Sequence, residues 1–107
     1  IHIALNDETR DFVTAKELAL MKRSSIIVNA ARGPIVNAQD LSDALKEGRI
    51  SGAALDVYDV EPPLDSNNPM LDAPNTILLP HIGFATKEAF ELRLGIVVNN
   101  VEQFCKQ

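Results

Sequence analysis

Several residue types are scarce in this chain, and each scarcity excludes a class of protein. The 107 residues include a single cysteine, Cys105, so neither an internal disulfide nor a zinc site built on cysteines can form. There is no tryptophan and aromatic residues make up 5% of the chain, so the core must be aliphatic. No apolar run exceeds about five residues, whereas a membrane-spanning helix needs about 20. The net charge of -5 leaves no basic excess for nucleic acid or an anionic membrane.

The remaining composition is that of an ordinary globular protein. Apolar residues make up 46% of the chain and charged residues 23%, which excludes disorder and low complexity. The length suits one domain or a piece of a larger one. Because the sequence starts at Ile1 inside an apolar run, we expect a fragment or an excised domain. The lone cysteine favours a reducing compartment, and we expect a cytoplasmic protein.

Four short apolar runs predict four strands of a parallel sheet. The runs span residues 1–5, 25–29, 52–57 and 76–79, and none alternates polar with apolar residues. Continuous apolar runs of this length are typical of strands buried on both faces.

Helix-start signals separate the predicted strands. Thr14 opens a capping box before residues 15–21, Asn37 precedes a second helix that ends near Gly48, and Thr86 can cap a long third helix. The third helix carries an apolar stripe from Phe90 to Phe104 at spacings of three and four, which we expect to pack against the rest of the protein. Cys105 is expected to be a small core residue.

The order β-α-β-α-β-loop-β-α predicts an α/β fold with right-handed crossovers in a mostly parallel sheet. Two short crossover helices cannot cover both faces of four buried strands, so we expect another half-domain to supply the missing cover. Residues 58–74 hold four of the six prolines and form a long loop, and such loops are usually functional.

Polar residues follow three of the predicted strands, where parallel sheets bind their ligands. Arg32 follows the second strand, Glu61 the third and His81 the fourth. An arginine can bind a carboxylate with two hydrogen bonds, and a histidine can give or take a proton at neutral pH. A carboxylate on the second ring nitrogen would fix the tautomer and favour the protonated ring. This combination suits the binding of a 2-oxo acid and protonation of its oxygen. The five glycines never form G-x-G-x-x-G, so a phosphate-binding turn is missing and the residues alone indicate no hydride source.

Three segments resemble the signature motifs of the D-isomer-specific 2-hydroxyacid dehydrogenases. They are Asn29-Ala-Ala-Arg-Gly33, Gly52-Ala-Ala-Leu-Asp-Val-Tyr-Asp-Val-Glu-Pro62 and Leu79-Pro-His-Ile-Gly83. They occur in the family's order and cover essentially the whole chain. The resemblance implies a Rossmann-like parallel sheet, in which residues 1–85 form the second half of the NAD-binding domain. Residues 86–107 would form a long helix that returns toward a substrate domain.

The resemblance also implies a reaction and a role for each motif residue. Arg32 corresponds to the anchor of the substrate carboxylate, His81 to the general acid/base, and Glu61 to the partner of the histidine. The reaction would be hydride transfer between a D-2-hydroxy acid and its 2-oxo acid, with NAD as the expected cofactor and NADP left open. No metal is expected. The family's glycine-rich turn would precede Ile1, so the isolated piece is expected to be inactive. The residues expected to contact the cofactor are Leu5, Asn6, Ala30, Ala31, Arg32, Asp56, His81, Ile82 and Gly83.

Substrate and assembly follow from the same resemblance. Within the family, the segment after His81, together with Arg93, is more similar to glycerate and hydroxypyruvate reductases. Phe84 differs from the small residue or tryptophan that the family often has at this position. We expect a small 2-oxo or 2-hydroxy acid as substrate, a homodimer, and neither nucleic acid nor membrane as partner.

Alternative interpretations stay open for the site residues. His81 is also compatible with a surface histidine, and Arg32 with an ion pair to Asp59 or Glu61. Asp59 competes with Glu61 for the histidine, and Asp56 is also suited to capping loop backbone. A second function class is an NAD(H)-sensing binding module of the C-terminal-binding-protein corepressor type, which resembles this family and retains such a trio.

Overall fold

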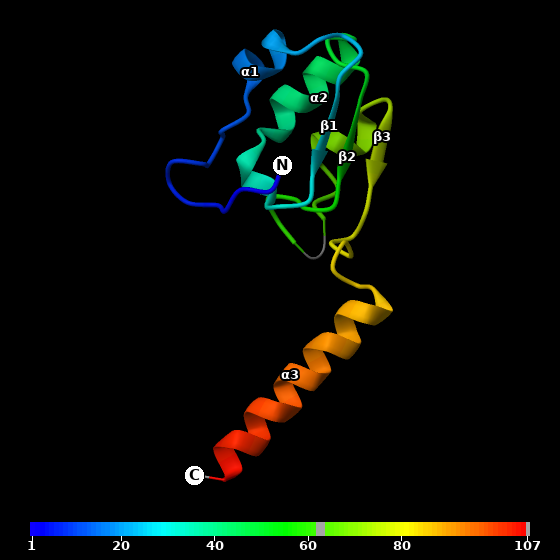
Figure 1. Cartoon of the computed structure of the whole chain (residues 1–107). Coiled ribbons are helices and arrows are strands. Elements are labelled where there is room, and N and C mark those ends of the chain that lie inside the picture. The colour runs from blue at the N-terminus through cyan, green and yellow to red at the C-terminus, as the bar shows by residue number, and fades with distance from the viewer. Residues whose placement is uncertain (62–63, 107) are drawn as a thin grey trace.

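A computed structural model describes residues 1–61 and 64–106, in which three parallel strands form one sheet (Figure 1). The strands are β1 (Ile26–Asn29), β2 (Gly52–Leu55) and β3 (Thr76–Leu78), in the order β1-β2-β3. Their parallel pairing confirms the predicted α/β fold. Two prolines of the expected long loop, Pro62 and Pro63, lie outside the described residues, as does Gln107.

The helices begin where the sequence predicts, because each start is set by a local hydrogen bond. The three α-helices are α1 (Ala15–Leu20), α2 (Ala38–Lys46) and α3 (Lys87–Cys105). The side chains of Thr14, Asn37 and Thr86 accept hydrogen bonds from backbone amides in the first turn of α1, α2 and α3, respectively. Two short 3-10 helices, η1 (Gly33–Ile35) and η2 (Pro69–Asp72), lie in the loops that follow β1 and β2.

The core lies on one face of the sheet. Leu18 of α1, Leu41 and Leu45 of α2 and Met70 of η2 pack with the inward residues of the strands. The prediction that the strands are buried on both faces is wrong for β1 and β3, because alternate side chains are exposed there, whereas β2 has no exposed residue. The exposed side chains on β1 and β3 are Ile26, Val28 and Ile77. Both α1 and α2 lie on the same side of the sheet, and none of the residues 1–61 and 64–106 forms a helix on the other face (Figure 1).

The first predicted strand, residues 1–5, does not form. The amino group of Ile1 donates to the carbonyl of Val28 at 2.7 Å, but no further ladder bond follows in the described residues. A strand needs a partner with several consecutive hydrogen bonds, and one bond does not establish a ladder. The segment therefore lies as irregular chain beside the end of β1.

Helix α3 extends away from the sheet as a straight rod and gives the molecule an extent of 60 × 27 × 26 Å (Figure 1). None of its described residues is buried. The prediction that Cys105 is a core residue is wrong, because its side chain is exposed at the end of this helix. Among residues 1–61 and 64–106, no helix combines the length and apolar character needed to cross a membrane.

Candidate active site

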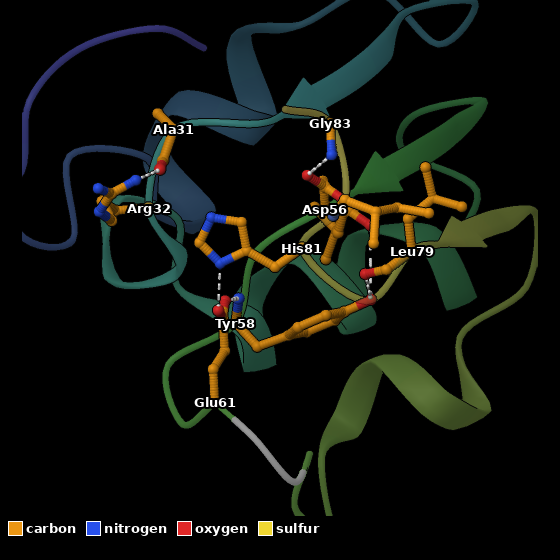
Figure 2. Close-up of polar contacts among 10 residues, drawn as sticks. Ala31, Arg32, Asp56, Tyr58, Glu61, Leu79, His81 and Gly83 are labelled. Carbon is orange, nitrogen blue, oxygen red and sulfur yellow. Dashed lines mark hydrogen bonds and ion pairs between the residues drawn. The ribbon is translucent and has the colours of Figure 1, made fainter. Parts of the chain in front are cut away.

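A histidine and a glutamate from separate loops contact each other beyond the end of the sheet. Nδ1 of His81 lies 2.5 Å from Oε2 of Glu61 (Figure 2). The second carboxylate oxygen, Oε1, accepts the backbone N–H of Tyr58, also at 2.5 Å. Glu61, rather than its competitor Asp59, therefore contacts the histidine. Because Glu61 engages Nδ1, the Nε2 side of the ring is left for other chemistry.

A buried carboxylate fixes the backbone that follows His81. Oδ1 of Asp56 accepts the N–H of Ile82 at 2.8 Å, and Oδ2 accepts the N–H of Gly83 at 2.7 Å. Asp56 is only 7% exposed and stands at the end of β2. The interpretation of Asp56 as a cap of loop backbone is thus confirmed. A side chain at position 83 would displace the Asp56 carboxylate, since a Cβ would lie 2.8 Å from Oδ2 of Asp56.

His81 itself has a positive φ of 56°, a conformation uncommon for residues other than glycine. Such conformations persist where surrounding contacts impose them, and they concentrate at functional sites. The two hydrogen bonds that Asp56 accepts directly after His81 are those contacts. The backbone thereby turns the imidazole toward Glu61.

Arg32 lies on a turn that the buried Asn29 organises. Oδ1 of Asn29 accepts the N–H of Ala31 at 3.1 Å, and its Nδ2 donates to the carbonyl of Arg32 at 2.9 Å. The guanidinium of Arg32 donates to the carbonyl of Ala31 at 2.6 Å, and the residue is exposed. Within the described residues no ion pair joins Arg32 to Asp59 or Glu61, so the guanidinium has no protein carboxylate partner there.

Arg32 lies on the Nε2 side of His81, although the cavity that it lines is not the one that Glu61 and His81 line. Figure 2 shows Arg32, His81 and Glu61 together, with the ring nitrogen that does not bind Glu61 turned toward the side of the view where Ala31 and Arg32 lie. Gly33 permits this approach of the loops, because a Cβ on it would lie 2.0 Å from the carbonyl carbon of Tyr58. The turn that bears Arg32 therefore packs directly against the loop that bears Glu61.

Tyr58 joins the Glu61 loop to the end of β3. Its hydroxyl donates to the carbonyl of Leu79 at 3.0 Å. Burial raises the pKa of the Tyr58 hydroxyl, and the negative charges of Asp56 and Glu61 raise it further. The hydroxyl thus keeps the proton that this hydrogen bond needs. Sequence reasoning missed both Tyr58 and Asn29; a polar residue ending the apolar run of residues 26–29 was the available signal for Asn29.

A cavity of about 630 Å³ opens beside the Arg32 turn. It is lined by His2, Ile3, Ala4, Leu5, Ala30, Ala31 and Arg32. Four of the residues expected to contact a cofactor line it: Leu5, Ala30, Ala31 and Arg32. Ala30 and Ala31 directly follow β1, and the carboxyl ends of strands are where α/β sheets bind dinucleotides. Asn6 does not line it; its side chain accepts the N–H groups of Glu8 and Thr9.

The remaining cofactor-contact candidates lie on the loop after β3. The backbone amides of Ile82 and Gly83 are both bound by Asp56, so these three residues form one unit next to His81. A second cavity, of about 460 Å³ and mostly apolar, lies on the side of His81 that includes Leu79 and Phe84. In the described part of the chain, no cluster of histidine, cysteine and acidic side chains is arranged to hold a metal ion.

Comparison with known proteins places these features in one family. The family model described as "D-isomer specific 2-hydroxyacid dehydrogenase, NAD binding domain" matches residues 1–83. Hydroxypyruvate reductase of Blautia hydrogenotrophica is 43% identical over 106 residues, which is 99% of this chain and 33% of that protein. The chain spans about a third of the length of the first curated relatives that it matches.

Solved structures agree with the sequence comparison. A D-lactate dehydrogenase from Sporolactobacillus superposes with a TM-score of 0.88 at 34% identity, over 99% of this chain and 36% of that chain. D-Lactate dehydrogenase from Aquifex aeolicus, solved with NAD and lactic acid, superposes with a TM-score of 0.84 at 28% identity, over 98% of this chain and 36% of that one.

Proposed function

The chain belongs to the D-isomer specific 2-hydroxyacid dehydrogenase family, and from this premise we propose that the whole protein interconverts a D-2-hydroxy acid and its 2-oxo acid. The single observation that carries the proposal is the contact of 2.5 Å between His81 and Glu61, with Arg32 on the Nε2 side of the ring. The matched part of the family is its NAD-binding domain. Arg32 and His81 would together supply what a 2-oxo acid needs: a cation for its carboxylate and a proton donor for its carbonyl oxygen.

We assign the proton transfer to His81. With Glu61 on Nδ1, the protonated ring can donate from Nε2 to the oxygen that gains negative charge during reduction. The Glu61 carboxylate stabilises the positive ring, and the Tyr58 amide holds that carboxylate in place. In the oxidative direction the neutral ring removes the hydroxyl proton through the same nitrogen.

Arg32 is proposed to anchor the substrate carboxylate. Guanidinium and carboxylate match in a planar pair of hydrogen bonds, which fixes the orientation of a small acid. In support, the guanidinium is exposed and its hydrogen bond is to a neutral backbone carbonyl. An incoming carboxylate would be a stronger, charged acceptor for it.

The residues around the 630 Å³ cavity are those that would hold NAD. We propose that Leu5, Ala30 and Ala31 contact it, with Asn6 and the Asp56-bound loop at Ile82 and Gly83 as further contacts. The chemistry that the dinucleotide supplies when bound is hydride transfer to or from C2 of the acid. The chain's own part is to orient the substrate and to move the proton.

Further properties of the whole protein are proposed on the family resemblance. The substrate is a small acid such as hydroxypyruvate, since a relative at 43% identity is named hydroxypyruvate reductase. Residues 86–107 lead toward a substrate domain, and the protein is a cytoplasmic homodimer. Sedimentation of the whole protein tests the last point, and a monomer would refute it.

Steady-state oxidation of NADH by the whole protein tests the function. Hydroxypyruvate, glyoxylate and pyruvate are compared for the wild type, Arg32→Ala and the control Arg23→Ala, an exposed arginine that precedes β1, whereas Arg32 follows it. We expect turnover in the wild type and the control. In Arg32→Ala, kcat/KM should fall by about a hundredfold or more. The reason is that the variant loses a charged hydrogen bond to the substrate, which stabilises the transition state by about 3 kcal/mol. NADH binding without turnover of any 2-oxo acid would refute the enzyme and favour the sensing module.

A further inference from the structure

Phe84 connects His81 to helix α3 through three packed contacts. The rings of His81 and Phe84 meet edge to face, with centroids 6.1 Å apart and planes at 81°. Phe84 in turn packs against Phe90 at 6.2 Å and 65°. The guanidinium carbon of Arg93 lies 5.1 Å from the centroid of the Phe84 ring. The chain of contacts therefore runs from α3 to the catalytic pair.

Each contact has the geometry of a favourable interaction. Edge-to-face aromatic pairs are attractive at centroid distances of about 4.5–7 Å. A guanidinium within about 6 Å of a ring centroid is attracted to the ring face. Phe90 and Arg93 are three residues apart and so share one face of α3. The two side chains can therefore hold the same ring.

The backbone also limits where Phe84 can lie. The N–H of Ala85 donates to the carbonyl of Ile82 at 2.8 Å, and the N–H of Thr86 to the carbonyl of Phe84 at 3.0 Å. This turn joins the segment that Asp56 binds to the first turn of α3. Phe84 is nevertheless 45% exposed, so it is not a core residue whose only role is burial.

The His81 ring needs a second contact for a defined orientation. The hydrogen bond to Glu61 fixes one nitrogen, but the ring can still tilt about that bond. A ring edge-on to Phe84 cannot tilt without losing the aromatic contact. Nε2 therefore points in one direction. Small errors in the orientation of a catalytic group lower the reaction rate strongly.

We propose that Phe84 is a positioning residue for His81, and that Phe90 and Arg93 hold Phe84 in place. The inference rests on the proposed function of His81 as the general acid/base. It makes α3, through its first two turns, a support of the active site. Phe84 acts through His81 and does not itself touch the reacting atoms.

Kinetics of the whole protein test the proposal. Phe84→Leu removes the ring and keeps an apolar side chain, whereas Phe84→Tyr keeps the ring. We expect Phe84→Leu to lower kcat by about tenfold, with KM for the oxo acid nearly unchanged. A well-placed acid or base accelerates a reaction by about 10²–10⁴-fold, and a misoriented His81 would lose part of that factor. Phe84→Tyr should restore most of the turnover, and Phe104→Leu, at the far end of α3, should behave as wild type. Arg93→Met should give an intermediate loss of about twofold to threefold.

A second set of measurements separates positioning from a merely structural role. In a Glu61→Gln background, Phe84→Leu should cost much less than in the wild type, because both changes release the same ring. The ¹³C relaxation signals of the His81 ring, assigned from their loss in His81→Gln, should report a more mobile ring in Phe84→Leu and wild-type mobility in Phe104→Leu, with the Glu61-bound tautomer kept in both. Equal losses of kcat in both backgrounds, or unchanged ring signals in Phe84→Leu, would overturn the proposal. If the wild type reduces no 2-oxo acid, the proposed function fails, and the ring signals alone decide whether Phe84 positions His81.

Discussion

Asp56 is the single residue on which the position of His81 depends most directly. It is buried, it stands at the end of β2, and both its oxygens accept backbone N–H groups directly after His81. The left-handed backbone of His81, with φ of 56°, costs about 1 kcal/mol or more. The charged hydrogen bonds of Asp56 offset that cost. Cofactor contact by Asp56 stays a prediction beside this positioning role.

Asp56→Asn should therefore weaken both fold and activity. An amide has one acceptor oxygen, so one of the two loop N–H groups would face an NH2 group instead. We expect the free energy of unfolding in urea to fall by about 1–3 kcal/mol, and kcat to fall with it. The control is Asp72→Asn, an exposed acid of η2. Equal unfolding free energies for Asp56→Asn and Asp72→Asn would contradict this account of the loop.

Gly33 is the second residue for which a substitution should disrupt the site. A Cβ there would lie 2.0 Å from the carbonyl carbon and 2.2 Å from the carbonyl oxygen of Tyr58, both backbone atoms. Gly33→Ala should force the two loops apart and destabilise the protein by about 1–3 kcal/mol. Thermal unfolding measures the change. Gly95→Ala is the matched control, because nothing lies within 4 Å of a Cβ at that helical position; a loss of similar size there would show that the overlap at Gly33 is not the cause.

Among the secondary-structure elements, helices were easier to predict from sequence than strands. The caps at Thr14, Asn37 and Thr86 lie within three residues of the amides they bind, so the sequence contains both partners. Residues 1–5 have the composition of a strand, but a strand is made by its neighbours, and only Ile1 finds one here. Continuous apolar runs likewise predicted burial on both faces, although burial depends on what covers the sheet.

The capping box of α1 makes a prediction about pH. Hydrogen bonds from the Thr14 side chain and backbone lower the pKa of Glu17 below its ordinary value of 4.5. A lowered pKa means that the contribution to stability is present above pH 4.5 and is lost as the pH falls through the folded value. We expect the unfolding free energies of wild type and Glu17→Gln to differ at pH 7 and to converge in acid. A constant difference between pH 7 and pH 3 would contradict the role given to the ionised carboxylate.

In the molecule as a whole, the candidate site is assembled from loops that follow three neighbouring strands. The positions of Arg32, Glu61 and His81 after predicted strands, and then the motif resemblance, predicted these three residues, and the contact between Glu61 and His81 is present. The supporting residues were not predicted, because their partners are distant in sequence. Tyr58 reaches Leu79 across 21 residues, and Phe84 is held by a helix whose apolar stripe predicts only general packing against the rest of the protein. Such contacts depend on strand register and loop path, which no local pattern encodes.

The central claim is that Arg32, Glu61 and His81 act on one substrate molecule in one crevice. The most direct test is a crystal structure of the whole protein with NADH and oxamate, an unreactive analogue of a 2-oxo acid. The account predicts that the analogue's carboxylate binds the Arg32 guanidinium, and that its carbonyl oxygen lies within about 3.2 Å of Nε2 of His81 while Glu61 keeps Nδ1. An analogue bound away from Nε2, or an Arg32 side chain turned from its carboxylate, would contradict it.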